Sequence, residues 1–224
     1  MQRCECLEIL DQEGVPDRVL AQAYRELRMV HFWLGNTGAV LRVLRSAIRE
    51  RADSEPVRRV LDIGCGQGAL MIAIREELGL DVMGIDLRPA PVETPVPILT
   101  GNAVTDPLPR ADIAVCVVMA HHLSETELAA MIGNVAQSCR RFILLDLVRH
   151  PLPLMLFRFF VTPFLGRINA LDGQTSIHRA YTAEEMRRIV DEALNRSERP
   201  VRRLRHTVGP LWIRQVVDIS WETQ

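Results

Sequence analysis

The sequence has no lysine, and all 27 of its basic side chains are arginine. This absence excludes chemistry that depends on a lysine, such as a Schiff base, a Walker-type phosphate site or a kinase-type ATP site. Neither sign of charge is in excess, because 28 acidic residues leave a formal net charge of -1. A chain without a broad positive field is not expected to bind nucleic acid.

Cysteine is also scarce, and its spacing shows no framework of close pairs. The first residues, MQRCECLEIL, lack the basic region and long apolar run of a signal peptide. We therefore expect a reducing, cytoplasmic location. Cys4 and Cys6 are interpreted as ordinary thiols near a mobile terminus. No second close pair of Cys or His completes a ligand pattern, so we expect no metal.

The length of 224 residues and a hydrophobic content of 48% predict one domain with a sizeable core. Apolar residues at three- and four-residue spacing predict a helix over 17–34, and a second helix follows from about 36 to 48. The polar stretch ERADSEPVRR then interrupts the pattern. We interpret residues 1–56 as an N-terminal helical lid and residues 57–224 as the main domain.

From residue 57 onward, short apolar runs alternate with helical stretches. Strands are predicted at 57–64, 81–87, 95–101, 112–120 and 140–148, and two more flank the Gly209-Pro210 turn. Helices begin at 69 and at capping boxes that open on Ser124 and Thr182. This alternation predicts an α/β fold with a doubly wound, mostly parallel, seven-stranded sheet and an antiparallel C-terminal strand. Ligands bind such sheets beyond the carboxyl ends of the strands.

A glycine-rich turn, VLDIGCGQG, follows the first of these strands at 60–68. Glycine lets the backbone approach a ligand closely. The spacing of Gly64, Gly66 and Ala69 nominally suits a dinucleotide, but Asp62 would repel a diphosphate and attract a cationic ligand. S-adenosylmethionine carries a sulfonium and an ammonium and no phosphate, and Asp86 can accept from its ribose. The sequence therefore favours S-adenosylmethionine over NAD.

Four segments in order resemble the successive motifs of class I S-adenosylmethionine-dependent methyltransferases: VLDIGCGQG, GIDL, GNA at 101–103 and DIAVCVVMAHHL. The resemblance covers roughly residues 57–148 and implies a Rossmann-like fold and methyl transfer. It also implies a set of residues around the cofactor, namely Asp62, Gly64, Cys65, Gly66, Asp86, Leu87, Asn102, Ala103 and Met119. Many relatives have Asp where this chain has Asn102, whose carbonyl oxygen can still accept from the adenine amino group.

Methylation of a phenol, whose pKa is about 10, gains from a base that titrates near neutrality, which suits histidine. His121 follows the fourth strand at the ligand-facing edge and is one candidate base. His178 is the other. His122 adjoins a helix cap and fits loop packing, and His206 fits a structural role in a late strand.

The sequence between the fifth strand and the Thr182 box, residues 149–181, reads as an insertion. Aromatic residues are only 5% of the chain, yet four of its six Phe lie between Phe157 and Phe164. The apolar stretch 152–165 is interrupted and shorter than the ~20 residues of a bilayer span, so we expect no transmembrane segment. A core helix, an interfacial segment and the wall of an acceptor pocket all fit, and the pocket wall is favoured.

The next stretch, DGQTSIHRAYT, is similar to a segment of methyltransferases of quinone and phenolic-lipid biosynthesis. That likeness implies that Asp172, Ser176, His178 and Arg179 lie near the site. Otherwise Asp172-Gly173 is a turn and Arg179 a surface or helix-associated charge.

The sequence thus predicts a methyltransferase acting on a small lipophilic or aromatic acceptor, at a phenolic oxygen. Alternatives are C- or N-methylation, or a cofactor-binding scaffold without activity. The expected acceptor contacts are Tyr24, His31, Phe157, Phe160 and Arg179, and a homodimer stays open.

Overall fold

The fold is described from a computed structural model, which covers residues 1–12, 14–50, 56–89 and 94–222. The side chains of 17, 31 and 32 are outside that description. Half of the predicted junction ERADSEPVRR, residues 51–55, and residues 90–93 of the Pro-rich stretch after Arg88 also lie outside the described residues.

A seven-stranded sheet with the order β3-β2-β1-β4-β5-β7-β6 forms the centre of the molecule. Its strands are β1 (Arg59–Ile63), β2 (Asp81–Asp86), β3 (Ile98–Thr100), β4 (Ala111–Val117), β5 (Cys139–Leu147), β6 (Val201–Val208) and β7 (Arg214–Trp221). The first five run parallel, and β7 is antiparallel to both β5 and β6. The predicted fold class, including the antiparallel C-terminal strand, is confirmed.

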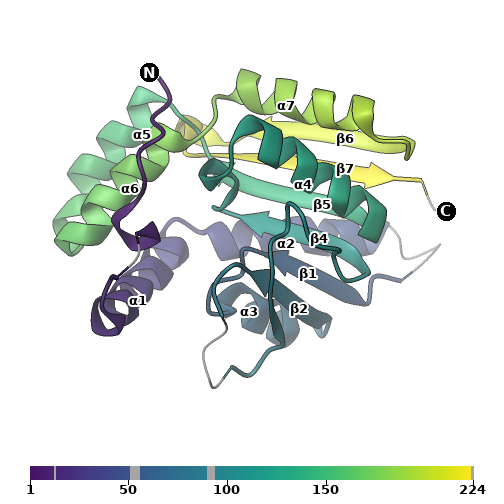
Figure 1. The fold of residues 1–224 in the computed structure, drawn as a ribbon, viewed down its shortest axis with the longest axis horizontal. Helices are drawn as coiled ribbons and strands as arrows, with labels where there is room; N and C mark the ends of the chain where they lie inside the picture. The colour runs from purple at the N-terminus through teal and green to yellow at the C-terminus, as the bar shows by residue number, and fades with distance from the viewer. Residues whose placement is uncertain (13, 51–55, 90–93, 223–224) are drawn as a thin grey trace.

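Helices cover both faces of the sheet, as its doubly apolar strands require (Figure 1). On one face α2 (Asn36–Glu50) and α3 (Ala69–Leu78) pack into a core with β1, β2 and β4. On the other face α4 (Glu125–Ser138) and α7 (Ala183–Arg196) surround a core that includes Phe142, Tyr181 and Trp221. Both predicted capping boxes are present, at Ser124 and Thr182.

The remaining helices gather beside the carboxyl ends of the parallel strands (Figure 1). They are α1 (Asp17–Trp33), α5 (Pro151–Leu156), the π-helix η3 (Phe157–Val161), the 3₁₀ helix η4 (Thr162–Phe164) and α6 (Arg167–Arg179). Three short 3₁₀ helices complete the fold: η1 (Ile9–Asp11), η2 (Ala120–His122) and η5 (Pro210–Trp212). Asp172 and Gly173 lie inside α6, so the alternative of a turn at these residues is wrong.

The N-terminal residues 1–12 cross this same edge, and we call them the strap. Figure 1 shows the strap beside α6, and its Cys4 N–H donates to the His178 carbonyl at 3.1 Å. Cys4 and Cys6 form a disulfide in the structure, so the expectation of separate thiols is wrong. Among the described helices, none is long and apolar enough to cross a membrane.

Candidate functional site

The glycine loop follows β1 and turns the chain into α3. Gly64 has φ +70°, and a Cβ there would lie 2.5 Å from Met119 Cγ, so only glycine fits this backbone and its neighbour. The Gly64 N–H donates to the Ile85 carbonyl at 2.8 Å, and the Gly66 N–H donates to Asp86 Oδ2 at 2.8 Å. These two hydrogen bonds hold the loop against the end of β2, where Asp86 lies.

Asp62 is a buried carboxylate at the end of β1, only 3% exposed. Burial, with a smaller contribution from Asp86, raises its pKa to about 8. The structure gives its carboxylate no hydrogen bond to another described residue. An isolated buried carboxylate is costly unless a cation compensates it, so its position suits a positively charged ligand.

The loops after β2 and β3 complete this side of the site. Asp86 Oδ1 accepts from the Arg88 N–H at 3.0 Å, and Leu87 is 69% exposed and thus open to contact. Asn102 Oδ1 accepts from the Val104 N–H at 2.9 Å, so one lone pair of the oxygen expected to meet adenine is already used. The Ala103 carbonyl accepts from Asn134 Nδ2 at 2.9 Å. The carboxylates, glycines and apolar Leu87 fit a ligand with cationic, ribose and planar parts.

The end of β4 carries a strained backbone next to the glycine loop. Val118 has φ +52°, which is an outlier for a β-branched residue and is typical of functional sites. Its N–H donates to the Leu145 carbonyl at 2.8 Å. Met119 follows and packs against Gly64. Val118 also lines a cavity, so adjacent residues of the chain contact the glycine loop and the wall of that cavity.

This cavity has a volume of about 300 Å³ and an apolar wall. It lies between α1, the ends of β4 and β5, the α5–η3 segment and α6. Its lining residues are Leu27, Val30, Leu34, Asn36, Val118, Leu147, Pro153, Leu156, Phe157, Phe160, Val161, Gly173, Ser176, Ile177 and Ile213. Asn36 and Ser176 supply its polar side chains. The cavity therefore suits a largely apolar molecule with a polar group near Ser176.

The predicted acceptor residues divide into those that line the cavity and those that do not. Phe157 and Phe160 line it. The Tyr24 hydroxyl instead accepts from Arg88 at 2.9 Å, beside the loop after β2. Arg179 is buried and donates to the His122 and Cys6 carbonyls at 3.0 and 3.2 Å, so it is not a surface charge. His31 lies in α1, and its side chain is outside the described residues.

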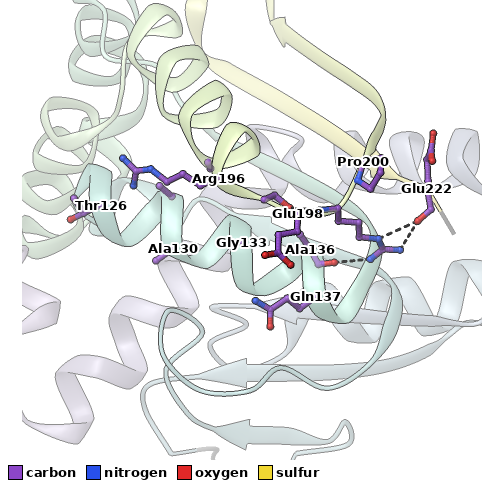
Figure 2. Close-up of a pocket in the computed structure, with 13 residues that line it drawn as sticks. Thr126, Ala130, Gly133, Ala136, Gln137, Arg196, Glu198, Pro200 and Glu222 are labelled. Atoms are coloured by element: carbon purple, nitrogen blue, oxygen red, sulfur yellow. Dashed lines mark hydrogen bonds between the residues drawn. The ribbon is translucent and has the colours of Figure 1, made fainter. Parts of the chain in front are cut away.

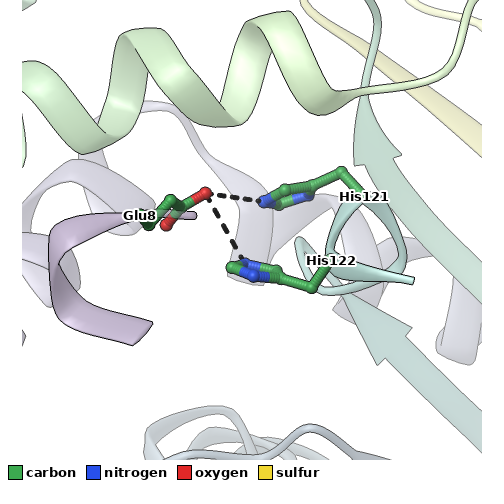
Figure 3. Close-up of side chains that lie close together, drawn as sticks. All are labelled: Glu8, His121 and His122. Carbon is green, nitrogen blue, oxygen red and sulfur yellow. Dashed lines mark ion pairs between the residues drawn. The ribbon is translucent and has the colours of Figure 1, made fainter. Parts of the chain in front are cut away.

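The strap contributes an acidic side chain, Glu8, that the sequence did not single out. Figure 3 shows Glu8 facing two neighbouring imidazoles, with its Oε1 3.6 Å from His121 Nε2 and 3.8 Å from His122 Nε2. Each histidine also has its own aspartate: His121 Nδ1 is 2.8 Å from Asp146, and His122 Nδ1 is 2.9 Å from Asp11. Glu8, His121 and His122 could together hold a metal ion, because their potential ligand atoms lie within 4.8 Å of one another, and they are the group of this kind among the described residues.

Within this group, Glu8 and His121 each favour the charged form of the other. Burial opposes the charged ring of His121, but Asp146 and Glu8 outweigh it and raise the His121 pKa to about 9. Burial likewise opposes the Glu8 carboxylate, but the two imidazoles lower its pKa. Glu8 Oε1 also accepts from Ser176 Oγ at 2.7 Å. The geometry is that of an ion pair, Glu8 with protonated His121, that touches the cavity through Ser176.

His178, the other candidate base, is half-buried in the last turn of α6. Its neighbours along α6 bind the strap: Asp172 accepts from the Ile9 and Leu10 N–H groups at 2.8 and 3.0 Å. Tyr181, just after α6, donates to the Leu123 carbonyl at 2.7 Å. The D-G-x-x-S-x-x-R-A-Y pattern thus joins α6, the strap and η2. Asp146, a carboxylate within the apolar run of β5, is a signal that sequence reasoning could have used.

A second hollow, of about 820 Å³, lies between α4, α7 and the start of β6 (Figure 2). Arg199 crosses it and donates to the Ala136 and Cys139 carbonyls at 2.6 and 2.8 Å. Because Cys139 begins β5, this hollow lies at the amino end of that strand. Ligands bind sheets of this kind at the opposite edge, so the glycine loop and the 300 Å³ cavity are the candidate active site.

One known protein family matches more than half of the chain. The family described as methyltransferase domain matches residues 36–193, a range that runs from α2 to α7. No curated protein sequence matches the chain at a significant level.

Several solved structures share the fold at low sequence identity. The plantazolicin methyltransferase BpumL in complex with SAH has a TM-score of 0.65 at 11% identity, over 92% of this chain and 91% of that one. The methyltransferase domain of bacterial CtHen1 has a TM-score of 0.55 at 15% identity, over 82% and 96%. Magnesium protoporphyrin IX methyltransferase (ChlM) from Synechocystis PCC 6803 with bound SAH has a TM-score of 0.53 at 17% identity, over 95% and 91%.

Proposed function

The chain belongs to the methyltransferase domain family, and we propose that it moves a methyl group from S-adenosylmethionine to a phenolic oxygen of a small apolar or aromatic acceptor. The apolar cavity of about 300 Å³ carries this proposal, because its wall includes Val118, and the next residue, Met119, packs against Gly64 of the glycine loop. When bound, S-adenosylmethionine supplies an electrophilic methyl group on its sulfonium.

The proposed donor site uses the predicted residues. Asp62 would face the cationic methionine end, where its unpartnered carboxylate needs a positive charge. Gly64, Cys65, Gly66 and Met119 would line that end. Asp86 would accept from the ribose hydroxyls with the lone pairs that its two backbone bonds leave. Leu87, Asn102 and Ala103 would contact the adenine.

The proposed acceptor lies in the cavity, with its ring against Phe157 and Phe160 and its oxygen near Ser176. An apolar wall binds such a molecule mainly by removing apolar surface from water. The fixed cavity also orients the acceptor and keeps water from the reacting oxygen, which is the main contribution a protein makes to a displacement reaction. The other structures' named acceptors, plantazolicin and magnesium protoporphyrin IX, differ too much to specify this one.

The polar side of the cavity leads to a group that can accept the phenolic proton. Ser176 Oγ lies between the cavity and Glu8, whose carboxylate is ionised. A phenolic oxygen becomes strongly acidic as it gains a methyl group, so a carboxylate is a sufficient proton acceptor. We assign that role to Glu8. His121, which Asp146 orients, then holds Glu8 charged and in place, and His178 stays the alternative base.

The test is transfer of a labelled methyl group from S-adenosylmethionine to matched phenols, anilines and C-nucleophilic aromatics of increasing alkyl length. We expect transfer to phenols, with KM falling as the alkyl chain lengthens, and an O-methyl product by mass spectrometry. Donor binding in calorimetry without transfer to any phenol would contradict the acceptor assignment. N- or C-methyl products would establish the alternative chemistry.

The proton route is tested with single variants at saturating donor. Glu8→Gln and Ser176→Ala should lower kcat at least tenfold with the donor Kd unchanged, because each interrupts the path from the cavity. Glu192→Gln, on the exposed side of α7, is the matched control. If His178→Ala lowers kcat and Glu8→Gln does not, His178 is the base.

A further inference from the structure

Seven large apolar side chains stay exposed beside the cavity, and we call them the aromatic patch: Trp33, Met155, Phe159, Phe160, Phe164, Leu211 and Trp212. Phe159 and Phe160 are each 70% exposed, and Phe164 is 66% exposed. Side chains this open protrude from the surface. Soluble proteins rarely expose so many large apolar groups together without using them for binding.

The patch is continuous across elements that are far apart in sequence. Trp33, at the end of α1, packs edge-on against Phe164 with ring centroids 6.1 Å apart. Trp212, in η5, stacks on His150 at the start of α5 with ring centroids 4.9 Å apart. The α5–η3–η4 segment between them carries Phe159 and Phe160. One connected surface therefore joins α1, this segment and η5.

The charge around the patch is positive. No Asp or Glu occurs between Asp146 and Asp172, whereas Arg158 and Arg167 lie in that interval. Both arginines are exposed, and neither forms an ion pair with another described residue. The acidic residue that faces this segment is Glu26 of α1, which the Gly166 N–H and the Asn169 amide bind at 3.0 and 2.7 Å. Aromatic side chains with flanking arginines are typical of segments that lie in an anionic bilayer surface.

The cavity reaches the surface within the patch. Phe160 lines the cavity and is also one of the most exposed patch residues. Leu156 and Val161, on either side of it in sequence, line the cavity as well. A molecule that enters past Phe160 therefore crosses the patch first.

We propose that the aromatic patch docks this protein on the surface of an anionic lipid bilayer, with Phe159, Phe160 and Phe164 inserted at the level of the headgroups. The arginines favour lipid phosphates over a neutral partner, and the protruding rings suit a fluid interface better than a preformed protein groove. No described helix crosses the bilayer, so the attachment is peripheral. The docking rests on exposure and charge. Its use, to take a lipophilic acceptor from the membrane, rests on the proposed function.

The experiment is sedimentation with vesicles of phosphatidylcholine alone or with phosphatidylglycerol, without donor or acceptor. We expect the full chain to sediment with the anionic vesicles and to be released by high salt, which screens the arginines. Phe159→Ser with Phe164→Ser should lower the partition coefficient about a hundredfold, at roughly tenfold for each ring. Neither residue lines the cavity. Arg158→Glu with Arg167→Glu should abolish the preference for anionic lipid.

The matched control removes two exposed apolar side chains elsewhere, Leu99→Ser with Val201→Ser, on the two edge strands of the sheet. It should sediment like the wild type. Equal sedimentation of the Phe variant and the wild type, or no binding to either vesicle, overturns the proposal. A dimer in light scattering that the Phe variant dissociates, without vesicle binding, assigns the patch to a second copy of the chain instead. The vesicle experiment contains neither donor nor acceptor. A negative result would therefore overturn the membrane docking without testing the proposed methyl transfer, which has a separate assay.

Discussion

Replacing Asp62 by Asn should make the folded protein more stable and at the same time weaken its binding of the donor. In the folded chain, burial and the nearby Asp86 raise the pKa of Asp62 to about 8, against about 3.9 in an unfolded chain. The folded state therefore holds this proton more tightly. The contribution of Asp62 to the free energy of unfolding consequently falls as the pH rises from about 4 to about 8, and it is level above that.

The size of the effect follows from the width of this pH interval. The interval spans about four pH units, and pH 7 lies about three units above its lower end. Each pH unit corresponds to about 1.4 kcal/mol of unfolding free energy. Ionisation of Asp62 in the unfolded chain, while the folded chain keeps the proton, thus reduces the stability of the wild type by about 4 kcal/mol at pH 7 relative to pH 4. Asn has the same shape and does not ionise. Asp62→Asn should therefore be more stable than the wild type by up to about 4 kcal/mol at pH 7.

The assay is urea unfolding of both ligand-free proteins at several pH values between 4.5 and 8.5. The difference between them isolates Asp62, because the other titrating groups are shared. Asp81→Asn, an exposed carboxylate at the start of β2, is the control and should follow the wild type. In calorimetry, the wild type should bind the cationic donor more tightly as pH rises toward 8, and Asp62→Asn should bind it weakly throughout. A stability difference that does not change with pH would refute the reasoning.

Three further predictions concern the loop, the cavity and the charged cluster. Gly64→Ala should weaken donor binding at least tenfold in calorimetry, because its Cβ would lie 2.5 Å from Met119 Cγ at a backbone φ of +70°; unchanged affinity would contradict the close approach. Gly173→Ala should raise the acceptor KM without changing the donor Kd, since its Cβ would lie 2.3 Å from the Phe157 ring and force that ring to move; a change in donor Kd alone would argue against it. Dialysis against a chelator should leave turnover unchanged, because both ring nitrogens of His121 already face a carboxylate of the protein, Glu8 or Asp146; activity that is lost and then restored by a divalent metal would show a metal site instead.

The features that the sequence predicts well are those encoded locally. The capping boxes at Ser124 and Thr182 and the glycine turn after β1 each involve residues a few positions apart, so a pattern is enough. The strands were recognisable for the same reason, since each is a short apolar run between turns. The mostly parallel sheet, with its antiparallel C-terminal strand, then followed from the alternation of strands and helices and from the closing hairpin.

The strap was beyond this kind of reasoning. Glu8 meets Ser176 across 168 residues of sequence, and nothing in MQRCECLEIL distinguishes it from the exposed Glu5. His121 was recognisable from its place after β4, but its two carboxylate partners come from the strap and from β5. Only the folded chain shows that His121 is buried between two carboxylates, which raise its pKa, and that it does not line the cavity.

The structure also gives a physical reason for the D-G-x-x-S-x-x-R-A-Y pattern in α6. Asp172, Ser176 and Arg179 recur at four- and three-residue spacing, which places them on one side of a helix, and all three bind the strap or η2. Gly173 and Ile177 lie one position further on and line the apolar cavity. Helix α6 therefore separates a charged network from an apolar chamber, and its buried charges are tolerated because each has a partner. Ser176 belongs to both sides, so in the proposed reaction its hydroxyl would link the acceptor oxygen to the Glu8 carboxylate.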